Sequence, residues 1–132
     1  MSQHSIGSNP EAVKAKNYKQ LSKTILTMAI NKTIEGQNFI KGLAATTKSR
    51  ALSRCANFSY DNLVGDFKQT LGEITTEPYK IVSYALESVE YDVESCNSDI
   101  VAEHIVNPQV TALNKEMLLF GQMAYYATDG EF

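Results

Sequence analysis

Two cysteines and two histidines, Cys55, Cys96, His4 and His104, are the side chains of this 132-residue sequence that most readily do chemistry. Neither histidine has a nucleophile close to it in the sequence. A Cys-His catalytic pair would require His104 beside Cys96, and it would leave Cys55 as a free thiol. The pattern therefore does not predict an enzyme.

Three glutamates, Glu87, Glu90 and Glu94, are spaced to lie on one face of a helix. Such a row binds a metal ion only when histidine or a facing carboxylate cluster completes the ligand set. The sequence has no Glu-x-x-His, Cys-x-x-Cys or His-x-x-x-His spacing, and "GLAATTKS" lacks the Gly-Lys-Ser/Thr ending of a phosphate-binding loop. We interpret the row as a solvated face and expect neither a metal nor a cofactor.

Charge is distributed unevenly along the chain. Residues 1–54 contain nine Lys and Arg against two Glu, whereas residues 55–132 contain three against thirteen Asp and Glu. We interpret this as a basic first segment packed beside acidic later ones; the alternative is that the acidic part faces a partner. Nucleic-acid binding would depend on four lysines with few aromatic stacking partners, so we expect none. These are Lys14, Lys16, Lys19 and Lys23.

No apolar run approaches the roughly 18 to 20 residues of a membrane span, so no membrane insertion is expected. The opening "MSQHSIGSNPEAVKAKN" has neither the apolar core nor the cleavage site of a secretory signal. This sequence is therefore expected to carry no export signal.

Apolar residues that recur every three or four positions predict helices over about residues 10–43, 47–72, 75–96 and 108–129. Asn9 and Asn107, each followed by proline, are the expected N-caps. The apolar stripe of the first helix weakens at residues 31–38, where a bend is possible. The fold class that follows is all-α, an antiparallel up-down-up-down four-helix bundle over residues 9–130, preceded by a disordered tail at residues 1–8. The expected core residues of the first helix are Tyr18, Leu21, Ile25, Met28, Phe39, Ile40 and Leu43.

The cysteines are separated by 41 residues, and the midpoint between them falls between Thr75 and Thr76. If the second and third helices turn there, Cys55 and Cys96 are equally far from the turn and meet at the open end of the hairpin. The spacing therefore favours a disulfide that staples the two helices. Buried or idle thiols in a reducing compartment are the alternative.

Two sequons, at Asn31 and Asn57, are candidate glycosylation sites. Either triplet alone is commonly a chance occurrence. Together with a disulfide they favour a secreted protein.

The segments "SRCANFSYDNLVGDF" and "EPYKIVSYALESVEYDVESC" resemble the plant invertase and pectin methylesterase inhibitor family. The resemblance covers about residues 8–128, and its specific part is the cysteine spacing combined with the helix order. The positions that match are Cys55, Tyr60, Leu63, Tyr79, Val82, Ala85, Leu86 and Cys96.

The resemblance implies a secreted, non-catalytic bundle, apoplastic or vacuolar, that blocks a plant carbohydrate-active enzyme. Family members also begin with a signal peptide and a disulfide-bonded helical hairpin, and we expect neither from this sequence. We expect a monomer that forms a one-to-one complex with its target. An inactive truncated bundle that serves as a structural or interaction module is the alternative.

Invertase inhibitors of this family use a Pro-Lys-Phe motif between the second and third bundle helices. The corresponding stretch here contains Pro78, Tyr79 and Lys80. Counted from Cys96, Lys80 falls at the position of the motif lysine, the proline lies one residue early, and Ile81 replaces the aromatic residue. Lys80 could face the paired carboxylates of a glycosidase. Because of this lysine we favour invertase over pectin methylesterase, whose inhibitors use the sides of the same helices. The acidic residues available on those sides are Asp61, Asp66, Glu87 and Glu90.

Overall fold

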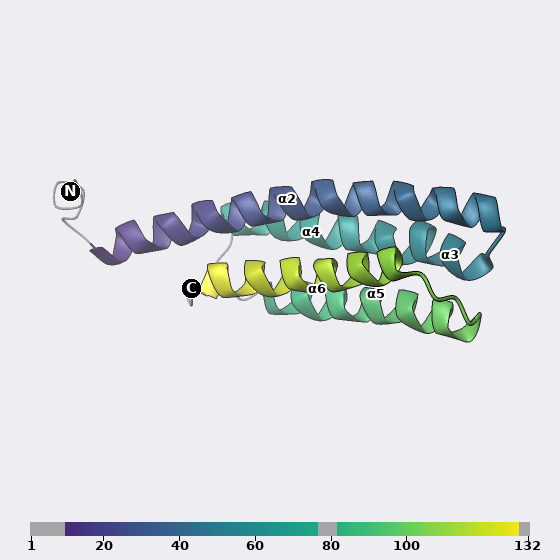
Figure 1. Ribbon diagram of the computed structural model, residues 1–132. Helices are drawn as coiled ribbons and strands as arrows, with labels where there is room; N and C mark the ends of the chain where they lie inside the picture. Colours follow the sequence, from purple (N-terminus) through teal and green to yellow (C-terminus); the bar gives the residue numbers. More distant parts are fainter. Residues whose placement is uncertain (1–9, 77–81, 130–132) are drawn as a thin grey trace.

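The computed structural model describes residues 10–76 and 82–129, which form helices that lie side by side (Figure 1). The predicted tail at residues 1–8 and the predicted tip residues Pro78, Tyr79 and Lys80 lie outside the described residues. The elements are α2 (Pro10–Thr47), α3 (Arg50–Arg54), the π-helical turn η1 (Cys55–Ser59), α4 (Tyr60–Thr76), α5 (Val82–Ala102) and α6 (Pro108–Asp129).

The helices make four rods, because α3, η1 and α4 follow one another without a break. The rod that contains α4 packs against α2 and α5, and α6 packs against the same two helices. Contacts of Thr33 with Met117 and of Gly36 with Leu113 show that α2 and α6 run antiparallel. The predicted all-α four-helix bundle is confirmed, while the up-down-up-down order of all four rods stays a prediction.

The buried face of α2 differs from the predicted stripe. Ile25 and Ile40 are buried as expected, but Leu21 and Met28 are 39% and 53% exposed. Because α2 packs against α4 on one side and α6 on the other, its inward face is broad and includes small and polar residues. The additional buried residues are Ser22, Leu26, Ala29, Thr33, Gly36 and Gln37.

Gly36 explains why the apolar stripe weakens in the middle of α2. A Cβ atom at this position would lie 3.2 Å from Leu113 Cδ2 and 3.2 Å from Tyr60 Cε2. The absence of a side chain therefore lets α2 approach the neighbouring helices closely. The polar stretch at residues 31–38 lies within one continuous helix and contributes to the bundle interior.

The π-helical turn η1 is a feature that the sequence pattern did not predict. Tyr60 donates its backbone N–H to the carbonyl of Cys55, five residues earlier, which leaves the carbonyl of Ala56 without that helical partner. Gln37 of α2 supplies the replacement, because its Nε2 donates to the Ala56 carbonyl oxygen at 2.7 Å. The turn thereby keeps Cys55, Ala56 and Tyr60 all buried.

Two predicted helix boundaries need correction. The first helix ends at Thr47, Lys48 has a positive φ of 57°, and Ser49 caps α3 by accepting from the backbone N–H of Leu52. Thr75 and Thr76 lie in α4 and not at the start of the next helix, so the break comes after Thr76. The hairpin is therefore not symmetric about the midpoint between the cysteines.

The predicted cap of the last helix is confirmed. Asn107 Oδ1 accepts hydrogen bonds from the backbone N–H groups of Gln109 and Val110, at 3.0 and 3.1 Å. These bonds satisfy two amides that have no partner inside the helix. Among the described helices, none has both the length and the apolar character of a membrane span.

Candidate functional site

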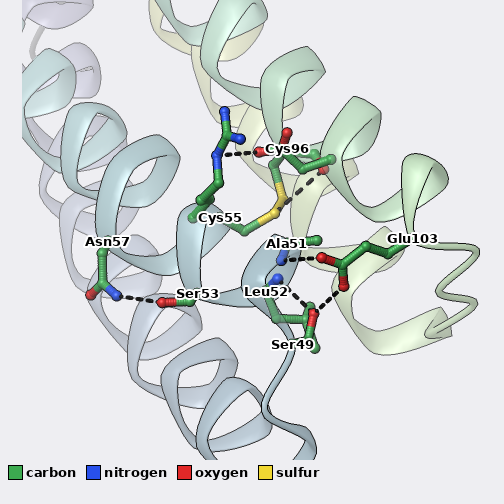
Figure 2. Close-up of polar contacts among 10 residues, drawn as sticks. Ser49, Ala51, Leu52, Ser53, Cys55, Asn57, Cys96 and Glu103 are labelled. Carbon is green, nitrogen blue, oxygen red and sulfur yellow. Dashed lines mark hydrogen bonds and ion pairs between the residues drawn. A yellow bond between two sulfur atoms is a disulfide. The ribbon is translucent and has the colours of Figure 1, made fainter.

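A disulfide between Cys55 and Cys96 staples the α4 rod to α5, as the sequence predicts (Figure 2). Neither cysteine is exposed to solvent. Together with the bond between Asn62 and Asp92 further along the same helices, the bridge shows that the α4 rod and α5 run antiparallel. The staple therefore holds a helical hairpin together at the end away from its predicted tip.

Glu103, just after the end of α5, strengthens the stapled end. One of its carboxylate oxygens accepts from the hydroxyl of Ser49 at 2.8 Å, and the other accepts from the backbone N–H of Ala51 at 3.0 Å (Figure 2). An anion at the first turn of α3 also interacts favourably with the helix dipole. The Arg54–Asp99 ion pair nearby is exposed on the arginine side, so it adds little stability.

A neutral hydrogen-bond network centred on Asn114 contacts the disulfide at Cys96. Asn114 Oδ1 accepts from the hydroxyl of Tyr60 at 2.7 Å, and its Nδ2 lies 2.8 Å from Asn97 Oδ1 and 3.4 Å from Cys96 Sγ. Burial raises the pKa of Tyr60, and the negative charge of Glu116 raises it further. The tyrosine therefore stays protonated and keeps donating at any ordinary pH.

A hollow of about 380 Å³ lies on the outer side of the same hairpin. Of the six described residues that line it, three are carboxylic acids and none is a cation, and Tyr91 is 69% exposed. A surface of this kind suits a cationic group, which would gain charge-assisted hydrogen bonds and contact with an aromatic ring. The lining residues are Asn62, Asp66, Glu87, Ser88, Tyr91 and Asp92.

Asp66 and Asp92 form a carboxyl pair at the floor of this hollow. Asp92 is only 4% exposed, and its Oδ1 accepts from Asn62 Nδ2 at 3.5 Å. Burial, then the hydrogen bond with Asp92 and the charge of Asp92, together raise the pKa of Asp66 to about 7. Burial also raises the pKa of Asp92, although hydrogen bonds from Asp66 and Asn62 oppose the increase.

Only some of the acidic residues that we named from the sequence line this hollow. Glu87 lines the hollow, whereas Glu90 and Glu94 lie exposed elsewhere on α5. Asp92 was missed, although a signal was present: it lies three residues after Val89 and four before Cys96, in register with the buried stripe. A carboxylic acid at a core position of a helix is stable only when a hydrogen-bond or charge partner compensates for its burial.

Both sequons lie in helical segments. Asn31 on α2 and Asn57 on η1 are exposed, and Asn57 Nδ2 donates to Ser53 Oγ at 3.2 Å. The hydroxyl-bearing third residues, Thr33 and Ser59, are fully buried. A sequon is ordinarily read as part of a surface loop, and neither of these triplets lies in one.

The described part of the chain contains neither a metal-binding cluster nor a Cys-His catalytic pair. Residues 10–76 and 82–129 contain no group of three or more His, Cys, Asp or Glu side chains that could hold a metal ion. His104 lies exposed after α5 with a φ of 57°. Cys55 and Cys96 are both oxidised, so neither is available to it as a catalytic thiol.

Comparisons with known proteins add no relative. No family model matches the chain, and neither a curated protein nor a solved structure matches it significantly. Its function is therefore inferred from the residues and from the geometry described above.

Proposed function

We propose that this chain is a protein inhibitor that blocks a plant carbohydrate-active enzyme by stoichiometric steric occlusion. The observation that carries the proposal is a disulfide-stapled hairpin, Cys55 to Cys96, that presents an acidic hollow on its outer side. It agrees with the family resemblance of the same two helices.

Occlusion requires a rigid surface, because ordering a flexible one on binding lowers the affinity. The disulfide and the two hydrogen bonds accepted by Glu103 hold the hairpin at its stapled end. No group of the inhibitor needs to react, since a bound hairpin excludes substrate by its volume. Carboxylates in the hollow would steer a positively charged enzyme surface toward it.

Invertase is the first target that we propose, because Lys80 in the hairpin connection suits the paired carboxylates of a glycosidase. The hollow favours pectin methylesterase as a second candidate, because inhibitors of that enzyme in the resembling family bind through the sides of these helices. In either case we propose a monomer that forms a one-to-one complex in the apoplast or vacuole.

The test is an inhibition assay of the purified, oxidised protein against invertase and pectin methylesterase, with the complex sized by analytical ultracentrifugation. We expect loss of activity at a one-to-one ratio for one of the two enzymes. Full activity of both enzymes at micromolar protein would contradict the inhibitor proposal. A one-to-one complex without inhibition would instead support the interaction-module alternative.

Two sets of variants separate the modes of binding. Lys80→Ala should raise the inhibition constant about tenfold or more if the hairpin tip enters the active site. The double variant Glu87→Gln, Tyr91→Ala should do so if the hollow makes the contact, and Glu94→Gln is its matched control on the exposed surface of α5. Inhibition that survives both sets of changes would exclude both proposed surfaces.

A further inference from the structure

The carboxyl pair in the hollow joins the two helices of the hairpin between the staple and the tip. Asp66 lies on α4 and Asp92 on α5, and the two helices run antiparallel. Since every Cα–Cβ bond of a helix tilts toward its N-terminus, the two side chains lean toward each other along the helix axes. The pair therefore bridges the seam between α4 and α5.

One oxygen of this pair lacks a hydrogen-bond donor. Asp66 Oδ2 is buried, and no donor of the described residues reaches it. Two ionised carboxylates have no proton to share, so Asp66 and Asp92 can hydrogen-bond to each other only when one of them is protonated. A single proton held between the two groups satisfies the buried oxygen and removes their repulsion.

None of the described residues that line the hollow carries a positive charge that could replace this proton. The described residues that line the hollow come from α4 and α5, and the ionisable groups among them besides the pair are Glu87 and the phenol of Tyr91. No charged side chain that the structure describes in α2, α3 or α6 lines the hollow, and η1 contains none. Each described group that lines the hollow beside the pair is therefore neutral or negative.

We infer that Asp66 and Asp92 form a proton-dependent clasp, which holds α4 against α5 in acid and weakens as the pH rises through neutrality. The hollow gives the shared proton a path to solvent, and its departure leaves two adjacent carboxylates. The disulfide keeps the other end of the hairpin closed. The loosening is therefore confined to the part between the clasp and the tip.

The direction of the pH dependence follows from the raised pKa of Asp66. The unfolded chain releases this proton near pH 4, whereas the folded chain keeps it until about pH 7. The stabilisation is complete below pH 4, declines between pH 4 and 7, and is absent above pH 7. This sign is opposite to that of an aspartate paired with a cation.

The test compares the wild type with Asp66→Asn, an isosteric variant that is neutral at every pH. Between pH 5 and 8 we expect the melting temperature of the wild type to fall by about 5 °C relative to the variant. Glu90→Gln removes an exposed carboxylate of α5 and is the matched control, which should follow the wild type. Equal pH dependence in the wild type and Asp66→Asn would overturn the clasp.

A second measurement needs no variant. In a carbon NMR experiment on the wild type, the carboxyl carbon of Asp66 should titrate near pH 7, and the carboxyl carbon of Asp92 should respond in the same step because the two groups are coupled. Hydrogen exchange, corrected for its intrinsic pH dependence, should accelerate about tenfold between pH 5 and pH 7 in residues 67–76 and 82–91 but not beside the disulfide. Titration of both carbons below pH 5 would overturn the inference whatever the chain inhibits.

Discussion

The Asn114 network and the Asp66–Asp92 pair both place polar groups inside the bundle, but their hydrogen-bond donors have different origins. Asn114 brings its own donors and meets Tyr60, Asn97 and the disulfide with all atoms neutral. Asp66 Oδ2 of the carboxyl pair has no donor among the described residues, and in the proposed clasp the pair takes a proton from solvent. A buried amide donates its hydrogen bonds at every pH, so it stabilises one structure under all conditions. A buried carboxyl donates only when it is protonated, so the stability of the structure around it depends on pH.

Of the changes near the Asn114 network, loss of the disulfide should lower the free energy of unfolding most. The bridge closes a loop of 41 residues, so the double variant Cys55→Ala, Cys96→Ala should lower the free energy of unfolding by about 4 kcal/mol. Urea unfolding of the variant, and of the wild type with and without reductant, measures the loss. A variant that unfolds at the same urea concentration as the oxidised wild type would show that the staple adds no stability.

Replacing Asn114 should cause the next largest loss in the free energy of unfolding. Asn114→Ala leaves the buried hydroxyl of Tyr60 without an acceptor, so we expect a loss of about 3 kcal/mol that is the same at pH 5 and pH 8. Asn62→Ala beside the carboxyl pair is the control, because it removes one long, partly exposed bond to Asp92 and should cost less than about 1 kcal/mol. Similar losses from the two variants, measured by urea unfolding, would remove the distinction between the regions.

The sequence predicts much of this architecture because its signals are local. Asn107 before Pro108 marks a helix start, and the stripe through Leu63 and Phe67 marks a buried face; both are observed. The disulfide was predicted for an inexact reason, since α4 continues through Thr76 and the hairpin is not symmetric about the cysteine midpoint.

The features that the sequence does not reveal depend on distant partners. Ala56 can give up its helical bond only because Gln37, nineteen residues earlier, replaces it. The exposure of Leu21 and Met28 follows from the position of α2 between two neighbouring helices, which periodicity within one helix does not define. Asp66 was expected on the side of its helix, but its pairing with Asp92 depends on how α4 and α5 align.

The smallest expected change in stability comes from substituting two glycines of α2, Gly36 beside the network and Gly42 away from it. Alanine at either position gains about 1 kcal/mol of helix propensity. Gly42 has no atom within 4 Å of the added Cβ, so Gly42→Ala should stabilise the protein by nearly this amount. At Gly36 the added Cβ would lie 3.2 Å from the ring of Tyr60, which is fully buried and fixed by Asn114.

Because this ring cannot move without breaking its hydrogen bond, the overlap should outweigh the propensity gain, and Gly36→Ala should destabilise by about 1 kcal/mol. Leu113, the other neighbour of Gly36, is only half-buried and has room to adjust. Thermal unfolding of both variants tests the contrast. If Gly36→Ala stabilises as much as Gly42→Ala, the Tyr60 ring is free to move, and the network does not hold this region rigid.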